Sequence, residues 1–509
     1  MTSWKMILVK LSATNSNMRY LHFAIILLCL CSCGQKPLGA PPAVLFGGEM
    51  HNSNASTPES IDASMDLASS LGYNCVLAPV SWTQTEVAPG NFDFTLVDHL
   101  LKAAEKRNLY LGLLWFGTWK NGESSYPPLW IRAQSEYAVA PDGTVATAIS
   151  PFCVTALEAD KAAFSALMAH LKKTDKARRV LNIQVQNECG AFMERDCSPD
   201  AQKAWEEGGW ASSNDPLAPQ KFMAEAFAKY VDAVAAAGKA VYDIPLFANA
   251  WLAPADKPYG KYPNGGPRIA VLDVWKANAP HLDWLSPDIY DKGFASFCEA
   301  YGVGQPLFIP ETSRQAGRYY YAFGEANAKG VFCFGYEESY DDPYYVQECR
   351  VFSELLPFLQ QGCPARGFFR EPKVDAPDAG FSLPLGDVAF AVHCIDGEKN
   401  AHGIIIQTGT DEYVIAGVGA WIDFGPGVKL ASCEELRGGR IWQVLNGDET
   451  GHHNMLYLRG RLYQEDFTAP DGTVVPAPMY GLSYQRRFKA VAHERFKVSG
   501  IYRIKLCKL

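Results

Sequence analysis

The sequence of 509 residues lacks the patterns that mark metal, phosphate or nucleic-acid chemistry. Its 14 cysteines include no CxxC pair and no cysteine–histidine cluster with ligand spacing, which argues against a structural zinc site. No glycine-rich phosphate loop joins a predicted strand to a helix. The formal net charge of -9 and the absence of a basic run argue against a nucleic-acid partner. We therefore expect no metal and no cofactor.

Long hydrophobic runs are also scarce, and the one near the N-terminus covers only residues 21–30. Arg19 precedes it, and the run is too short to span a bilayer, which is typical of an export signal. The following residues 30–33 (Leu-Cys-Ser-Cys) resemble the lipobox of bacterial lipoproteins, and the resemblance implies lipidation of Cys33. An ordinary cleaved signal is the alternative. Both readings predict an exported protein. The lipobox reading places it in the outer membrane or periplasm, with a lipid anchor as its membrane contact.

Length and composition indicate two structured domains after this signal. The chain is 48% hydrophobic and 12% aromatic, which is enough for a sizeable core. We expect a signal peptide at 1–33, a linker at 34–42, a first domain at 43–364 and a second at 365–509.

The first domain shows eight apolar runs that alternate with helical patterns, which predicts an α/β fold, a (β/α)8 TIM barrel. A doubly wound open sheet is the alternative, but it lacks the support of a phosphate loop. After Pro364 the pattern changes to short strands with glycine and Asn-Gly turns, which predicts a β-sandwich-like domain. Because the connection between the two is short, we expect this domain to dock on the barrel.

Two predicted barrel strands end in a carboxylate. The apolar run from Val180 ends in Asn187 and Glu188, and the run from Pro306 ends in Glu311. Functional residues of such barrels lie where strands end, and two carboxylates are the minimum equipment for glycoside hydrolysis. An acid at a strand end can also cap the following helix, so each glutamate alone has a structural alternative.

Other residues at predicted strand ends are candidates for sugar binding. Trp82, Trp115, Trp119 and Trp251 could stack on the apolar face of a sugar ring, with packing in the core as the alternative. Glu49 ends the first predicted strand and could accept hydrogen bonds from sugar hydroxyl groups, with a solvated loop charge as the alternative.

Several runs at strand ends resemble glycoside hydrolase family 35, the β-galactosidase family. They are residues 47–52, 79–82, 114–122, 184–188 and 309–312. Residues 383–387 and 446–450 resemble more narrowly the bacterial branch of that family with an extra β-rich C-terminal domain. The resemblance implies that Glu188 is the acid/base and Glu311 the nucleophile. It also implies that Asn187 bonds the sugar 2-hydroxyl and that Tyr290 lies near the nucleophile.

The sequence departs from that family at two places. Gln186 stands where the family usually has a glutamate, and residues 115–117 read Trp-Phe-Gly in place of Cys-Ala-Glu.

The leading hypothesis is a retaining, exo-acting β-galactosidase that acts on oligosaccharides or plant polysaccharide side chains, so galactosides would be its carbohydrate partners. The alternatives are another retaining glycosidase of the same clan, such as a mannanase or cellulase, and a surface sugar-binding lipoprotein without catalysis.

Overall fold

The computed structural model describes residues 41–253, 257–371, 374–376, 378–395, 400–425, 427–436, 455–458, 461–463, 466–468, 474–476 and 496–508. The predicted signal peptide, including Cys33, lies outside these residues. The described residues from Pro42 onwards form one compact unit. Among the residues described, no helix combines the length and the apolar character needed to cross a membrane.

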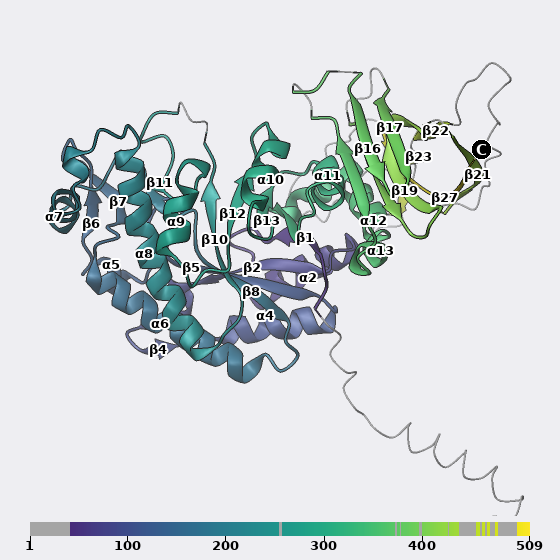
Figure 1. Ribbon diagram of the computed structural model, residues 1–509. Helices are drawn as coiled ribbons and strands as arrows, with labels where there is room; N and C mark the ends of the chain where they lie inside the picture. The colour runs from purple at the N-terminus through teal and green to yellow at the C-terminus, as the bar shows by residue number, and fades with distance from the viewer. Residues whose placement is uncertain are drawn as a thin grey trace, which may run out of the picture. The chain divides into compact units, whose positions relative to one another are not determined.

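Eight parallel strands of the described chain close into a barrel in the order β1-β14-β13-β12-β10-β8-β5-β2 (Figure 1). They are β1 (Leu45–Glu49), β2 (Cys75–Ser81), β5 (Tyr110–Lys120), β8 (Val180–Asn187), β10 (Leu246–Trp251), β12 (Trp284–Ile289), β13 (Phe308–Thr312) and β14 (Gly330–Phe334). The predicted (β/α)8 barrel is confirmed, and the open doubly wound sheet is excluded because β1 pairs with both β2 and β14.

Helices alternate with these strands and lie outside the barrel (Figure 1). The main ones are α2 (Pro58–Ser70), α4 (Thr95–Lys106), α6 (Val154–Thr174), α7 (Pro199–Glu207), α8 (Ala218–Val241), α9 (Leu272–Asn278), α10 (Phe294–Gly302), α11 (Ala316–Gly324) and α12 (Pro343–Ser353). The shorter ones are α3 (Trp82–Thr85), α5 (Leu129–Arg132) and α13 (Leu356–Gln360). Helix α2 begins with Thr57 as N-cap and Pro58 at the first position, and the Thr57 side chain accepts a hydrogen bond from the Ser60 amide.

Side chains alternate between the barrel interior and the helix layer, since successive residues of a strand point to opposite sides. In β5, Leu114 and Phe116 belong to the apolar cluster that fills the barrel, together with Phe308. Trp115 between them points outward and packs on Phe164 of α6, with ring centroids 5.8 Å apart. This alternation decides which residues of a strand reach the barrel mouth.

The C-terminal region forms two facing antiparallel sheets, as the sequence predicts. One has the order β15-β18-β19-β27-β21 and the other β16-β17-β20-β22. Their strands are β15 (Ala365–Phe369), β16 (Gly380–Leu385), β17 (Val388–Cys394), β18 (His402–Gln407), β19 (Glu412–Val418), β20 (Ala420–Asp423), β21 (Val428–Glu435), β22 (Met455–Leu458) and β27 (Gly500–Lys508). Side chains of both sheets, among them Phe390 and Ile415, share a single apolar core, which makes this region a sandwich.

Short two-stranded sheets complete the described structure. They are β3 (Glu86–Ala88) with β4 (Asn91–Phe92), β6 (Tyr137–Val139) with β7 (Val145–Ile149), β9 (Gly190–Ala191) with β11 (Asn264–Gly265), β23 (Arg461–Tyr463) with β26 (Phe496–Val498), and β24 (Asp466–Thr468) with β25 (Val474–Pro476).

The sandwich contacts the barrel through helix α11, which packs against β15 and β18. The approach is close: a Cβ added at Gly324 would lie 2.7 Å from the backbone nitrogen of Gly367. Arg366 of β15 also donates two hydrogen bonds of 2.7 Å to Glu325, just beyond α11. The contacts agree with the expectation of a docked domain rather than a freely tethered one.

Candidate active site

Glu188 follows the last residue of β8, where the backbone turns sharply. Its φ is +44°, and that of Gln186 is +66°, in the left-handed region that residues with a side chain seldom adopt. The Glu188 amide donates a 2.9 Å hydrogen bond to Oδ1 of Asn249, from β10. The turn directs a side chain that is only 6% exposed towards the carboxyl groups carried by β12 and β13. Such backbone conformations are found preferentially at functional sites.

Glu311 lies on β13, and hydrogen bonds hold both of its carboxylate oxygens. Oε1 accepts from Nδ2 of Asn187 at 3.2 Å, and Oε2 accepts from the Tyr290 hydroxyl at 2.6 Å. Nζ of Lys120 donates to Oδ1 of Asn187 at 3.1 Å, which fixes the orientation of that amide. The structure thus brings together Glu188, Asn187, Glu311 and Tyr290, four residues singled out from the sequence.

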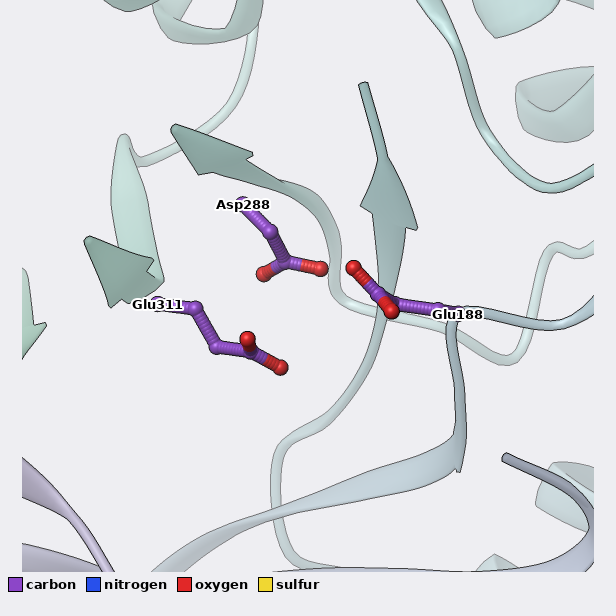
Figure 2. Close-up of side chains that lie close together, drawn as sticks. All are labelled: Glu188, Asp288 and Glu311. Atoms are coloured by element: carbon purple, nitrogen blue, oxygen red, sulfur yellow. The ribbon is translucent and has the colours of Figure 1, made fainter. Parts of the chain in front are cut away.

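The carboxyl groups of Glu188, Asp288 and Glu311 meet at the barrel mouth (Figure 2). Each contributes an oxygen that lies within 4.8 Å of the corresponding oxygens of the other two. Retaining glycosidases place their two carboxyl groups about 5–5.5 Å apart, whereas inverting ones need about 6.5–9.5 Å to admit a water molecule. The spacing of Glu188 and Glu311 therefore fits the retaining arrangement.

Burial and like charges set the protonation of this cluster. Burial, followed by the charge of Glu311, raises the pKa of Glu188 to about 8, although Lys120 and Asp288 act in the opposite direction. Burial and the neighbouring carboxylates also raise the pKa values of Glu49 and Asp288 well above their ordinary range. Glu188 therefore keeps a proton near neutral pH, as a general acid must.

Lys120, Asn249 and Asp288 were missed as site residues by the sequence reasoning. All three are buried; Lys120 ends β5, and Asn249 and Asp288 lie near the C-terminal ends of β10 and β12. The signal for Asp288 was present in the sequence, because it ends an apolar run in the same way as Glu311. Asn249 donates from Nδ2 to Oδ2 of Asp288 at 2.8 Å, a contact between strands that no sequence pattern displays.

The prediction that Trp82, Trp115 and Trp119 stack on sugar rings is wrong. Each is 0% exposed and belongs to the main apolar core, so none has a ring face to offer a ligand. Their indole N–H groups donate to Glu86, Asp160 and the Ile149 carbonyl, respectively. For Trp115 and Trp119 the cause is the alternation along β5, which directs them onto α6 and α8. Trp82 begins α3, beyond the end of β2, and its ring lies beside that of Trp115, with ring centroids 6.3 Å apart.

The other two predicted sugar contacts, Trp251 and Glu49, lie where they could contact a bound sugar. Trp251 ends β10, is partly exposed and packs edge-to-face on Phe192, with ring centroids 5.9 Å apart. Glu49 ends β1 and is 0% exposed, and neither of its carboxyl oxygens has a hydrogen-bond partner among the residues described. A buried polar group without a partner is costly, so these oxygens are poised to bond an incoming group.

The spacing of Glu188, Asp288 and Glu311 would also admit a cation, which binds to carboxylate oxygens. However, both Glu311 oxygens already accept hydrogen bonds, from Asn187 and Tyr290. This environment suits an oriented nucleophile, and we do not assign the carboxyl groups as metal ligands.

The fold and the site together define a (β/α)8-barrel protein with a carboxyl pair of the retaining-glycosidase type. A family model for glycoside hydrolase family 42, described as beta-galactosidase, matches residues 51–237. The match covers less than half of the chain and includes Lys120, Asn187 and Glu188. It supports the predicted likeness to β-galactosidases in general; the family number it carries is 42, whereas the sequence runs resemble family 35. None of the curated proteins compared with the chain matches it.

Three of the similar solved structures are two beta-galactosidases and the catalytic domain of a beta-amylase. A beta-galactosidase from Bacillus circulans sp. alkalophilus is 18% identical, with a TM-score of 0.45 over 63% of this chain and 56% of that one. A beta-galactosidase from Rahnella sp. R3 is 14% identical, with a TM-score of 0.47 over 65% and 58%. The catalytic domain of a beta-amylase from Paenibacillus polymyxa is 12% identical, with a TM-score of 0.44 over 58% and 93%. The chain thus spans little more than half the length of the two beta-galactosidases.

Proposed function

We propose that the protein is a retaining, exo-acting β-galactosidase with Glu188 as acid/base and Glu311 as nucleophile. The observation that carries the proposal is the pair of buried carboxyl groups, 6% and 5% exposed, whose oxygens approach within 4.8 Å. The raised pKa of Glu188 and the two donors on Glu311 give the members of the pair different roles. The beta-galactosidase family match supports the choice of sugar.

In the first step, Glu311 attacks the anomeric carbon while Glu188 transfers its proton to the glycosidic oxygen. The C–O bond to the leaving group breaks, the leaving group departs as an alcohol, and the sugar is held as an ester of Glu311. In the second step, the Glu188 carboxylate takes a proton from water, and the water oxygen attacks the anomeric carbon. The ester bond then breaks, and Glu311 and the protonated Glu188 are regenerated.

The neighbouring residues would bind and orient the terminal sugar. Asn187, held by Lys120 and next to Glu311, is placed to bond the hydroxyl beside the anomeric carbon. The unpartnered oxygens of Glu49 would accept hydrogen bonds from further hydroxyl groups. Partly exposed Trp251 offers an apolar surface near the end of β10. The natural substrates would be oligosaccharides or plant polysaccharide side chains that end in β-galactose.

A panel of aryl β-glycosides, with the product anomer followed by proton NMR, tests the proposal. We expect the β-galactoside to be hydrolysed fastest and β-galactose to appear before mutarotation produces the α-anomer. Release of the α-anomer first would contradict the retaining mechanism. A faster β-mannoside or β-glucoside would favour the mannanase or cellulase alternative, and tight galactoside binding without turnover would favour a sugar-binding lipoprotein.

We also propose that the protein is exported and lipid-anchored at Cys33. This rests on the sequence alone, through Arg19, the apolar run and the lipobox-like residues 30–33. Cells that express the full chain and are fed a palmitate analogue should incorporate the label, and Cys33→Ser should remove it. Equal labelling of both forms would contradict attachment at Cys33.

A further inference from the structure

The carboxyl group of Asp288 faces that of Glu188 across the barrel mouth (Figure 2). Asp288 lies on β12, is 2% exposed, and has an oxygen within 4.8 Å of one from Glu188. Asn249 holds the two residues together, because its Oδ1 accepts from the Glu188 amide and its Nδ2 donates to Oδ2 of Asp288. The other oxygen of Asp288, Oδ1, is buried and has no partner among the residues described.

Two buried carboxylates that face each other repel unless one of them carries a proton. Oδ2 of Asp288 already accepts a hydrogen bond from Asn249. A proton on Oδ1, the oxygen without a partner, could therefore be donated in a hydrogen bond. The surroundings favour this proton: Glu49, Glu188 and Glu311 face Asp288, and Lys120 is the cation that acts on the cluster. Burial, followed by the charges of these carboxylates, raises the pKa of Asp288 well above its ordinary range.

We propose that Asp288 is a positioning residue that stays protonated and donates a hydrogen bond from Oδ1–H to the carboxylate form of Glu188. The inference rests on the proposed acid/base role of Glu188. When Glu188 gives its proton to the glycosidic oxygen, a charge appears on a buried side chain, and the Asp288 donor stabilises it. When Glu188 later takes a proton from water, Asp288 keeps its own, so it neither gains nor loses a proton over the cycle.

Two variants at this position separate a neutral donor from a charge. In Asp288→Asn, the amide nitrogen still donates to Glu188 and the amide oxygen still accepts from Asn249. In Asp288→Leu, both contacts are lost in a side chain of similar size. We expect Asp288→Leu to lower kcat by about 10- to 100-fold, the scale of one hydrogen bond to a charged group. Asp288→Asn should recover most of that loss.

The direction in which the alkaline limb of the kcat/KM pH profile shifts distinguishes a neutral Asp288 from a charged one. Loss of a neutral donor destabilises the Glu188 carboxylate, so the alkaline limb of Asp288→Leu should move to higher pH, while that of Asp288→Asn should stay near the wild type. If Asp288 were instead an anion, both variants would remove a negative charge beside Glu188. Both limbs would then move to lower pH, and this result would overturn the proposal.

Infrared spectroscopy tests whether Asp288 is protonated, and it requires neither catalysis nor a folded Asp288→Leu variant. The spectrum of the wild type at neutral pH should contain a carbonyl band of a protonated carboxylic acid that is absent from Asp288→Asn. Asp142→Asn, at an exposed turn, is the matched control and should remove no such band. Identical bands in the wild type and Asp288→Asn would refute the protonated Asp288. If no glycoside is hydrolysed, the proposed function fails, but this measurement still shows whether Asp288 is protonated.

Discussion

Glu311→Ala should reduce kcat by about 10⁴-fold or more for every glycoside, on the scale seen when the nucleophile of a covalent mechanism is removed. The physical reason is that, in the proposed mechanism, Glu311 itself forms the covalent bond to the anomeric carbon. Asn187 and Tyr290 orient the Glu311 carboxylate, and their donors would be left without an acceptor in the variant. Steady-state rates with aryl β-galactosides of different leaving groups would measure the loss.

Azide provides a chemical check on the direction of attack. In Glu311→Ala, azide that enters the vacated space would attack from the side of the missing carboxylate and give an α-galactosyl azide. Glu338→Gln is a suitable control, because Glu338 is well exposed and pairs with Arg314 at 3.4 Å. A Glu311→Ala variant that retains more than about a tenth of wild-type activity would contradict the nucleophile assignment, since that loss amounts to only about 1.4 kcal/mol of transition-state stabilisation.

Glu188→Ala should lower the rate by an amount that depends on the leaving group. General acid catalysis contributes about 10²–10⁴-fold, and a poor leaving group needs all of it. An activated aryl galactoside needs little protonation, so its galactosyl ester on Glu311 should form and accumulate. Added azide should then speed breakdown of the ester and release a β-galactosyl azide, because it attacks from the side opposite to that of the nucleophile.

The pH profile adds a second test of Glu188. Its pKa is raised to about 8, chiefly by burial, so wild-type kcat/KM should fall above about pH 8 as the acid loses its proton. Glu188→Ala should lack this alkaline limb with an activated substrate. Equal rate losses for good and poor leaving groups, together with no effect of azide, would leave the carboxyl pair in place and show that its roles are assigned wrongly.

The sequence by itself determined the architecture of the first domain and its catalytic candidates. Apolar runs and helix-start signals such as Thr57-Pro58 depend on residues close together in the sequence. Both can therefore be recognised along the chain without knowledge of the tertiary structure. The ends of the runs that became β8 and β13 marked Glu188 and Glu311. The change in pattern after Pro364 likewise indicated the β-rich region, whose sheets form as expected.

Only the tertiary structure decided which side chains face the site and how they are protonated. Trp115 and Phe116 are adjacent in β5, yet one packs on α6 and the other fills the barrel, and a shift of one residue in a strand exchanges the two sides. Asp288 and Glu188 are 100 residues apart in the sequence and meet only because the barrel closes. Their burial and mutual repulsion, which set the pKa values of the site, exist only once that closure excludes water.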